Sequence, residues 1–258
     1  MRKRYLFFDI DGTLIAAGYG NAYVPLSCTL ALDKLREAGH FLAISTGRSE
    51  AMAREYMDLF GIRNMVSDGG YGLTFEGKLL EIRPLPRERM ITLIRECQSK
   101  GIPWGIQPDN SKTRLCPDNS FYDFTHDIYM ECKTVPGLDP EQFPMIYKAY
   151  VACLPGEEKT IKAMEGLPFC RSKKEYIFVE PTAKAEGIMR MMDILGAPYE
   201  DAIVFGDSLN DLSMFTGPWI KVAMGNAVQE LKDKSDFITK DVEQDGIYYA
   251  CEQLNLFN

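Results

Sequence analysis

Tyr5-Leu6-Phe7-Phe8-Asp9-Ile10-Asp11-Gly12-Thr13-Leu14 opens the chain and decides its fold. The apolar run over residues 5–8 predicts a buried β-strand, and the glycine that follows lets the chain turn. Two carboxylates, Asp9 and Asp11, stand two residues apart where this strand ends. Acidic side chains at such a position can share a metal ion and a phosphoryl group. The stretch therefore predicts the first strand of an α/β sheet with a chemically active end.

Beyond this stretch, strand patterns alternate with helix patterns, which is typical of a parallel sheet. In the first third of the chain the predicted elements are helices over about 30–38 and 49–59, strands over 41–45 and 64–67, and a hairpin over 74–79. Near the end they are a helix over 188–195, a strand over 202–205, a helix from Asn210 and a strand over 219–223. We therefore predict an α/β fold, a doubly wound, Rossmann-like parallel sheet made from both ends of the chain.

The middle of the chain has a different pattern. Pro84 and Pro86 punctuate the sequence and Pro181 closes the segment, so we expect an inserted domain between them. Its predicted elements are helices over 87–100 and 157–165 and strands over 103–107, 112–116, 145–153 and 175–180. The predicted domains are a core from residues 1–83 and 182–258 and an inserted α+β cap over residues 84–181.

Composition excludes several classes of protein. Of the 258 residues 46% are hydrophobic, yet no apolar stretch is long enough to span a bilayer. The formal net charge of -8 argues against nucleic acid, because proteins that bind it carry a clustered basic face. The seven cysteines have no C-x-x-C spacing and are odd in number, as expected for reduced thiols. We expect a cytoplasmic protein that binds neither membrane nor nucleic acid.

Polar side chains follow three of the predicted core strands. Asp9 follows the first, Thr46 follows the strand over 41–45, and Asp207 follows the strand over 202–205 across one glycine. The carboxyl ends of parallel strands meet at one edge of a sheet, where open α/β sheets bind ligands. Four carboxylates there, with Asp11 and Asp211 included, would repel a phosphate group, since like charges about 4 Å apart cost about 1–4 kcal/mol. The site therefore requires cations, and its oxygen ligands favour Mg²⁺.

With these residues in place, the chain resembles the haloacid dehalogenase superfamily of hydrolases, in its Cof-like branch with a type-two cap. The motifs that carry the resemblance are residues 9–14, Ser45-Thr46-Gly47-Arg48, Lys184, Gly206-Asp207-Ser208-Leu209-Asn210-Asp211 and Met224-Gly225-Asn226-Ala227. They extend over nearly the whole predicted core, whereas the cap is similar in size and position only. Two stretches depart from the family pattern, Lys184-Ala185-Glu186-Gly187 and Ser67-Asp68-Gly69-Gly70. Two roles stay open for Asp68, binding of sugar hydroxyl groups and capping of the turn that follows it.

The resemblance implies an Mg²⁺-dependent phosphatase of small phosphorylated metabolites, above all sugar phosphates. It implies that Asp9 becomes an aspartyl-phosphate and that Asp11 protonates the leaving oxygen and then activates water. The implied catalytic residues are Asp9, Asp11, Thr46, Lys184 and Asp211. The implied phosphate-binding residues are Asp11, Gly12, Thr46, Gly47, Arg48, Lys184 and Asn210. The implied ligands of Mg²⁺ are Asp9, the backbone carbonyl of Asp11, and Asp207, with Asp211 orienting a water ligand or Lys184.

Two other functions stay open at this point. A phosphomutase or phosphotransferase would pass the phosphoryl group of Asp9 to a second hydroxyl, whereas an inactive metabolite-binding protein would have lost a motif residue, and none is missing here. Candidates for substrate contact in the cap, each with a packing role as the alternative, are Trp104, Tyr147, Lys148, Tyr150, Arg171 and Tyr176. The sequence does not distinguish a monomer from a dimer.

Overall fold

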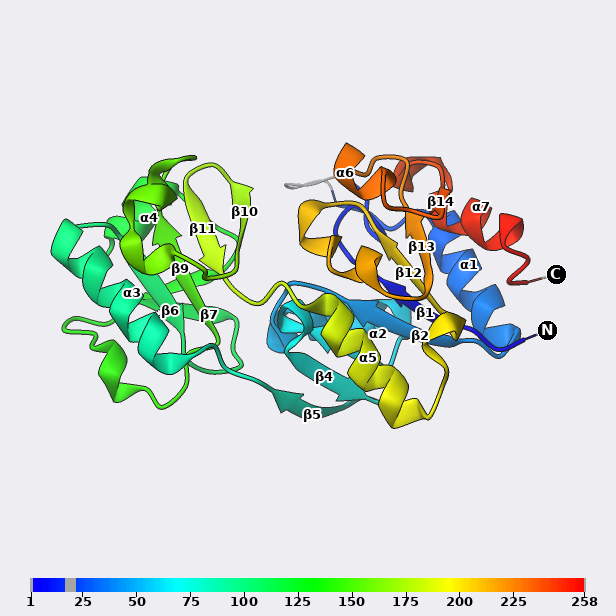
Figure 1. Cartoon of the computed structure of the whole chain (residues 1–258), viewed down its shortest axis with the longest axis horizontal. Helices are drawn as coiled ribbons and strands as arrows, with labels where there is room; N and C mark the ends of the chain where they lie inside the picture. Colours follow the sequence, from blue (N-terminus) through cyan, green and yellow to red (C-terminus); the bar gives the residue numbers. More distant parts are fainter. Residues whose placement is uncertain (1, 17–21, 258) are drawn as a thin grey trace. The chain divides into compact units, whose positions relative to one another are not determined.

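The computed structural model of the chain describes residues 2–16 and 22–257 and divides into two compact units (Figure 1). The first unit comprises Met1–Arg48, Ala53–Glu81 and Ala183–Asn258. The second comprises Ser49–Met52 and Ile82–Thr182. The first unit is thus built from both ends of the chain, with most of the second inserted between them.

An eight-stranded sheet in the order β14-β13-β12-β1-β2-β3-β4-β5 forms the first unit. Its strands are β1 (Tyr5–Phe8), β2 (Phe41–Ser45), β3 (Met65–Ser67), β4 (Gly72–Phe75), β5 (Lys78–Ile82), β12 (Ala202–Gly206), β13 (Ile220–Ala223) and β14 (Phe237–Ile238). The pairings from β14 across to β3 are all parallel, and β4 returns antiparallel to β3. All four residues of β1 pair with β2 on one side and β12 on the other. This topology confirms the predicted α/β class.

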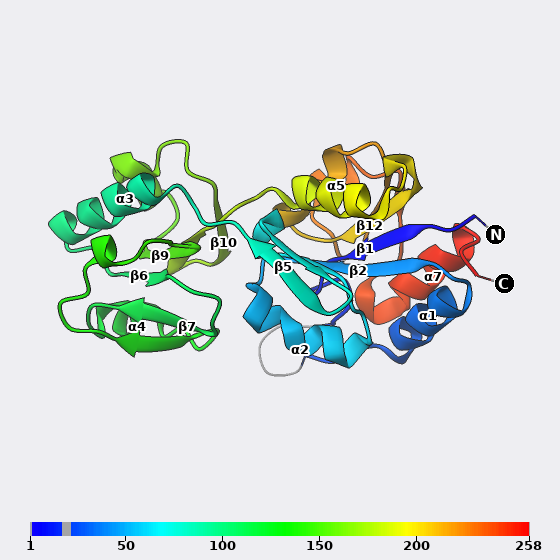
Figure 2. The same ribbon diagram turned by 90° about the horizontal axis from the view of Figure 1, so that it is seen from below.

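Helices cover both faces of this sheet, and this explains the apolar run that opens the chain. They are α1 (Leu26–Glu37), α2 (Glu50–Phe60), α5 (Lys184–Leu195), α6 (Gln229–Lys232) and α7 (Gly246–Gln253). Figure 2 shows α5 on one face and α1 and α7 on the other. Leu6, Phe7 and Phe8 are fully buried, as expected for a central strand covered on both sides. The central position of β1 fixes where its polar end lies.

Short 3₁₀ turns join several of the core elements. They are η1 (Asp68–Gly70), η5 (Tyr199–Asp201), η6 (Leu209–Asp211), η7 (Met214–Thr216) and η8 (Val242–Gln244). The helix predicted from Asn210 is wrong, because η6 and η7 take its place. Side-chain hydrogen bonds within η6 compete there with a longer helix.

The second unit is a six-stranded sheet in the order β10-β11-β9-β6-β7-β8. Its strands are β6 (Trp104–Gln107), β7 (Thr113–Cys116), β8 (Glu131–Thr134), β9 (Lys148–Ala152), β10 (Phe169–Lys173) and β11 (Tyr176–Val179). Its helices are α3 (Arg87–Lys100) and α4 (Ser120–Thr125), and its 3₁₀ turns are η2 (Pro140–Gln142), η3 (Glu157–Thr160) and η4 (Lys162–Met164). The helix predicted over 157–165 is wrong, since Ile161 is extended between two separate turns.

Alternate residues of the second sheet enter two different cores. Ala149 and Val151 of β9 pack with Met90 and Leu93 of α3, whereas Tyr150 packs on the other face in the cluster that contains α4. Adjacent residues of a strand point to opposite faces, so a sheet with helices on both sides has two cores. The alternation along β9 therefore serves packing on both faces of this unit.

Candidate active site

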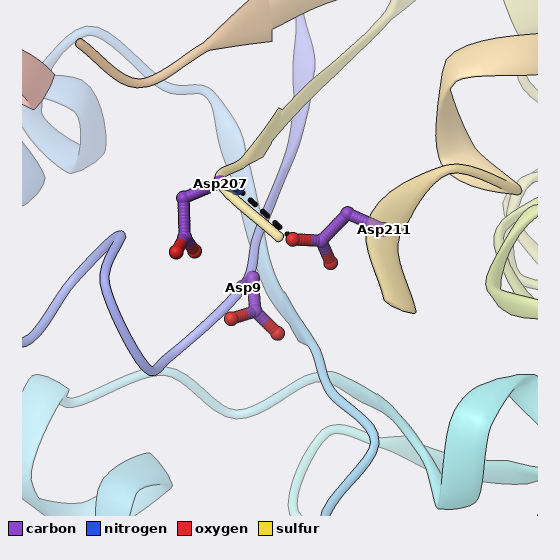
Figure 3. A group of neighbouring side chains, drawn as sticks. All are labelled: Asp9, Asp207 and Asp211. Carbon is purple, nitrogen blue, oxygen red and sulfur yellow. Dashed lines mark hydrogen bonds between the residues drawn. The ribbon is translucent and has the colours of Figure 1, made fainter. Parts of the chain in front are cut away.

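The carboxyl end of β1 places Asp9 beside Asp207, which follows β12 (Figure 3). The backbone N–H of Asp9 donates to the carbonyl oxygen of Phe205 at 3.0 Å, so the pairing of the two strands continues to this point. Gly12 then turns the chain with φ of +83°, and a Cβ atom at this position would lie 2.3 Å from Oδ2 of Asp207. Only glycine fits this turn, because it has both the positive φ and the close approach.

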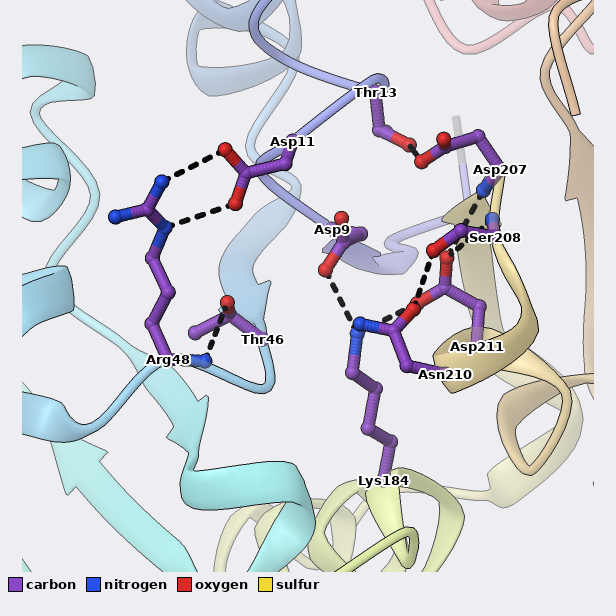
Figure 4. Close-up of polar contacts among 10 residues, drawn as sticks. All are labelled: Asp9, Asp11, Thr13, Thr46, Arg48, Lys184, Asp207, Ser208, Asn210 and Asp211. Atoms are coloured by element: carbon purple, nitrogen blue, oxygen red, sulfur yellow. Dashed lines mark hydrogen bonds and ion pairs between the residues drawn. The ribbon is translucent and has the colours of Figure 1, made fainter. Parts of the chain in front are cut away.

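Lys184, at the start of α5, is fully buried and lies between two carboxylates (Figure 4). Its Nζ donates to Oδ1 of Asp9 at 2.7 Å and to Oδ1 of Asp211 at 2.6 Å. Burial on its own would lower the pKa of Lys184, but Asp211 and Asp9 together raise it above its ordinary value. The lysine is therefore a fixed positive charge inside the site.

Three carboxylates share this one lysine. Oxygen atoms of Asp9, Asp207 and Asp211 all lie within 4.8 Å of one another. Burial, followed by the charge of Asp211, raises the pKa of Asp9 to about 7 and that of Asp207 to about 8. The cluster is therefore short of positive charge, and its donors are all carboxylate oxygens of the kind that hard divalent cations prefer. The residues present fit a metal site.

Asp211 holds the loop that follows β12. Oδ2 of Asp211 accepts the backbone N–H groups of Asp207 and Ser208 at 3.0 and 3.1 Å, while its Oδ1 binds Lys184. A Cβ atom on Gly206 would lie 2.8 Å from Asp211, so this glycine permits the close approach. Asp211 therefore fixes the loop that carries Asp207 as well as the lysine.

Hydrogen bonds also fix the turn after β1 against its neighbours. The hydroxyl of Thr13 donates to Oδ1 of Asp207 at 3.1 Å, and Nδ2 of Asn226 donates to the carbonyl oxygen of Gly12 at 2.8 Å. The Ser208 hydroxyl donates to Oδ1 of Asn210 at 2.6 Å. Thr13 and Asn226 are missing from the set of site residues predicted from the sequence, although both lie in motifs that carry the resemblance.

Asp11 is engaged differently from the other acids. Its two carboxylate oxygens accept Nε and Nη2 of Arg48, both at 2.8 Å, while its side chain is 59% exposed. The guanidinium of Arg48 also lies over the ring of Tyr56 at 4.9 Å. The resemblance assigns Arg48 to phosphate binding, and the structure places it in a bidentate ion pair with Asp11. Such a fork-to-fork pair fixes orientation as well as charge.

The remaining predicted phosphate ligands lie on the loop after β2. Thr46 is buried, and its Oγ1 accepts the backbone N–H of Arg48 at 3.1 Å, with Gly47 between the two. The structure thus brings Lys184 into contact with Asp9 and Asp211, and it places Asp207 close to both carboxylates. It sets Asp11, Arg48 and the Thr46 loop on another side of Asp9 (Figure 4).

A turn of three successive residues with positive φ supports this loop. The φ angles are +51° for Asp68, +61° for Gly69 and +107° for Gly70. The N–H of Asp68 donates to the Arg48 carbonyl at 2.8 Å, and the Gly69 carbonyl accepts the N–H of Ala183, next to Lys184, at 2.7 Å. Ser67 donates to Oδ2 of Asp68 at 2.8 Å. The turn therefore links the loop after β2 to the start of α5, and only the glycine pair hinted at it.

In the second unit, the candidates for substrate contact are held by internal contacts. Trp104 is buried in the core that includes α3, and Tyr150 and Tyr176 are buried in the other core. Lys148 pairs with Glu180, and Arg171 pairs with Glu158 at 3.0 Å. The hydroxyl of Tyr147 donates to the sulfur of Met145 at 3.4 Å, so each of the six candidates has a contact within the unit.

The fold and the acidic site together define the class of protein, a doubly wound α/β protein with a carboxylate-rich site at one edge of its sheet. A family model described as haloacid dehalogenase-like hydrolase matches residues 6–251, and the chain belongs to that family. It is 30% identical, over 99% of both chains, to "Putative phosphatase YkrA" of Bacillus subtilis. It is also 24% identical to "Pyridoxal phosphate phosphatase YbhA" of Escherichia coli, over 96% of this chain and 97% of that one.

Solved structures agree with this placement. A hypothetical protein from Geobacillus kaustophilus HTA426 has a TM-score of 0.86 and 33% identity, covering 99% of this chain and 100% of that one. The subclass IIB sugar phosphatase BT4131 has a TM-score of 0.80 and 25% identity, with the same coverage. The protein is thus a phosphatase of this family that acts on phosphoric monoesters of small molecules, and it carries an acidic cluster for a metal. None of the helices in residues 2–16 and 22–257 is long and apolar enough to cross a membrane.

Proposed function

We propose that the protein is an Mg²⁺-dependent phosphatase that transfers the phosphoryl group of a small metabolite, most of all a sugar phosphate, to Asp9 and then to water. The observation that carries the proposal is the buried contact of Lys184 with Asp9 inside a cluster of three carboxylates. A carboxylate nucleophile divides one difficult substitution into two easier ones. The lysine neutralises charge at the reacting oxygen without exchanging a proton.

In the first step a carboxylate oxygen of Asp9 attacks phosphorus, and the bond from phosphorus to the leaving oxygen breaks. Asp11 gives its proton to that oxygen as it departs. Because Asp11 is bound by Arg48 through both oxygens, we expect this ion pair to open before Asp11 acts as an acid. In the second step Asp11 takes a proton from the water that attacks phosphorus, which releases phosphate and restores Asp9.

Donors around the site match the charge that develops on the phosphoryl oxygens. Lys184 is already desolvated and fixed by two carboxylates, so no reorganisation precedes its use. We assign Thr46, the Gly47 and Gly12 amides and Asn210 to the other phosphoryl oxygens, and Asp211 to the positioning of Lys184. Such fixed donors account for most of the catalysis expected in phosphoryl transfer.

Asp9, Asp207 and the backbone carbonyl of Asp11 would hold Mg²⁺. When bound, the ion neutralises phosphate and carboxylate charge in the site. Burial, followed by the charge of Asp211, raises the pKa of Asp9 to about 7 and that of Asp207 to about 8, so added positive charge would stabilise both carboxylates. Oxygen donors and retained water ligands favour Mg²⁺ over softer metals.

The sugar phosphate preference rests on the similarity to sugar phosphatase BT4131. Another relative is named for pyridoxal phosphate, so the substrate panel has to include that ester. We also place the protein in the cytoplasm, because all seven cysteines are free thiols, which a reducing compartment preserves.

The test is release of phosphate from sugar phosphates, pyridoxal phosphate, nucleotides and an aryl phosphate, with Mg²⁺ and with EDTA. We expect metal-dependent release and a loss of at least about 10⁴-fold in kcat for Asp9→Asn, since a nucleophile is removed. A folded Asp9→Asn protein with near wild-type turnover would exclude Asp9 as the nucleophile. Isomerisation of a sugar phosphate with little free phosphate would favour a phosphomutase instead.

A further inference from the structure

A second cluster of charged and nucleophilic side chains lies in the second unit, on the adjacent parallel strands β7 and β8. Arg114 of β7 is directly paired with Cys132 of β8 in the strand register. The Nε of Arg114 donates to the sulfur of Cys132 at 3.1 Å. The site described above uses neither residue.

The guanidinium at this position is fully buried and surrounded by aromatic rings. It lies 4.6 Å from the ring centre of Phe121, 4.8 Å from that of Tyr150 and 5.6 Å from that of Tyr176. Asp127 pairs with its Nη2, whereas its Nη1 has no hydrogen-bond partner in the part of the chain that is described. A cation held in this way cannot turn away from the sulfur, and it keeps one unused donor.

A second thiol completes the cluster. Cys116, two residues after Arg114 on β7, is buried, and the interaction of the two thiols raises the pKa of Cys116 and lowers that of Cys132. Cys132 itself is partly exposed and lines a pocket of about 380 Å³. The pocket is lined by Asp118, Asn119, Tyr122, Asp127, Ile128, Met130, Glu131, Cys132 and Thr134. A sulfur that receives a hydrogen bond from a buried guanidinium and opens to a pocket is both stabilised as a thiolate and accessible.

We propose that Cys132 is a covalent modification site, a thiolate held by Arg114 and Cys116 that reacts with small uncharged electrophiles entering this pocket. Hydrogen peroxide is the natural class of reagent. The sulfur attacks one peroxide oxygen, an S–O bond forms as the O–O bond breaks, and the departing hydroxide takes a proton from a buffer acid in the solvent to become water. Cys132 becomes a sulfenic acid, oxidised by two electrons, and the peroxide is reduced to water.

The acidic residues of the pocket define which electrophiles fit. Asp118 and Glu131 line it without a partner of opposite charge among the lining residues, whereas Asp127 is paired with Arg114 and Lys173. An anionic reagent is repelled by these carboxylates, and an uncharged one is not. Cys132 should therefore discriminate against iodoacetate relative to iodoacetamide more strongly than a free thiol does.

The ionisation of Cys132 gives the proposal a quantitative test. The hydrogen bond from Cys116, then the charge and hydrogen bond of Arg114, lower the pKa of Cys132 to about 6, against the opposing effects of burial and Asp127. At pH 6 its thiolate fraction exceeds that of an ordinary cysteine, with a pKa of about 8.5, by about 160-fold. Lower basicity reduces the reactivity of each thiolate by about 13-fold. The net advantage is about tenfold at pH 6.

This advantage reverses as pH rises. At pH 8.5 the ordinary thiol is half ionised, so the less basic Cys132 reacts about sixfold more slowly than a reference thiol. The two rates should cross between about pH 7 and pH 8. Accessibility alone would change the rate by the same factor at every pH, so a crossing cannot arise from exposure.

The experiment is alkylation of the intact wild-type protein with iodoacetamide from pH 6 to pH 8.5, beside N-acetylcysteine, with each site followed by peptide mass spectrometry. Cys170 is the comparison within the protein, because it is also partly exposed. We expect Cys132 to be labelled first at pH 6 and to show the crossing. Cys116→Ser, which keeps a donor, should retain it, and Cys116→Ala should shift the crossing to higher pH.

A peroxide arm tests the oxidation directly. After brief treatment with hydrogen peroxide, dimedone should label Cys132 ahead of Cys170, and prior alkylation at pH 6 should abolish that label. Protein unfolded in guanidinium chloride should lose all preference among its seven cysteines. A constant ratio of Cys132 to the reference thiol at all pH values, or equal dimedone labelling of Cys170, would overturn the proposal.

Discussion

Both units of the molecule bury charged side chains, but they balance the charge in opposite ways. The first unit packs Asp9, Asp207 and Asp211 around one lysine. The second packs Arg114 and Lys173 around one carboxylate, Asp127. The difference shows in the acids, because the pKa values of Asp9 and Asp207 are raised. Burial also opposes the ionisation of Asp127, but hydrogen bonds from Lys173 and Arg114 hold its pKa below the ordinary value.

The comparison shows how a buried cluster of charges that stabilises the fold differs from one that binds a ligand. An acid whose partners are cations of the same chain is satisfied by the fold and contributes to it. An acid whose neighbours are mostly other acids is neutralised only when a cation binds from solution. Removing a carboxylate should therefore have opposite effects on stability in the two units, and the predictions below test this.

The largest effect on stability is expected in the second unit. Asp127→Asn leaves two cations without their common partner, one of them fully buried, and should lower the free energy of unfolding by about 3–5 kcal/mol. Urea denaturation measures it. Glu141→Gln is the control, since Glu141 pairs with Arg95 at an exposed position and should cost less than about 1 kcal/mol. A loss as small in Asp127→Asn as in the control would remove the contrast between the units.

Removing the cation of the first unit should act mainly on catalysis. Lys184→Met deletes the fixed charge beside Asp9 and should lower kcat by about 10²–10³-fold, as the loss of a single preorganised donor does. Vanadate affinity should fall in parallel, because vanadate imitates the phosphoryl group in transfer. Circular dichroism checks that the variant is folded. Vanadate binding as tight as in the wild type would place Lys184 outside the phosphate site.

The sign of the comparison is tested by Asp207→Asn in metal-free protein. Removing one of the three neighbouring carboxylates should stabilise the fold by about 1–2 kcal/mol, because it removes repulsion between like charges in the active site. The same variant should lose the stabilisation that Mg²⁺ gives the wild type, which is about 2.7 kcal/mol when the ion is at 100 times its Kd and is followed as a rise in melting temperature. If Asp207→Asn were less stable than the wild type with EDTA present, the three carboxylates would not carry more negative charge than Lys184 can neutralise.

The smallest effect concerns a carboxylate that is satisfied at the surface of the second unit. Glu96 accepts Lys100 at 2.6 Å and the backbone N–H groups of Lys162 and Ala163, and these bonds lower its pKa to about 2. Its contribution is therefore complete above pH 4.5 and is lost as pH falls toward 2. Glu96→Gln should cost about 1 kcal/mol at pH 7 and progressively less below pH 4.5. If the cost of Glu96→Gln were the same at every pH, the stabilisation by Glu96 would not depend on its ionised carboxylate.

Much of the first unit could be predicted from the sequence, because its elements are long and periodic. The bounds of β1 are confirmed, and the class of fold follows from the alternation of strands and helices. The second unit was harder to predict. The sequence pattern does not predict helix α4 or strands β8 and β10, and it predicts one helix where residues 157–164 form two short turns. Such short elements depend on tertiary packing more than on any local pattern.

The site shows the same division. That polar residues gather at the ends of β1, β2 and β12 follows from the geometry of a parallel sheet. The ion pair of Arg48 with Asp11 does not, because it depends on the rotamers of two side chains 37 positions apart. Nor does the turn at Asp68, whose positive φ is set by contacts with residues far along the chain.

The two-part construction of the first unit has a consequence for biosynthesis. Asp9 and Lys184 lie 175 positions apart, so at 5–20 residues per second the ribosome makes the lysine roughly 9–35 s after the aspartate. Until then β1 has only β2 as a neighbour, since its other partner, β12, comes still later in the chain. The inserted unit is nearly continuous and emerges whole within that interval. Newly made chains thus spend several seconds with a bare apolar strand edge, the stage at which a chaperone would have most to protect.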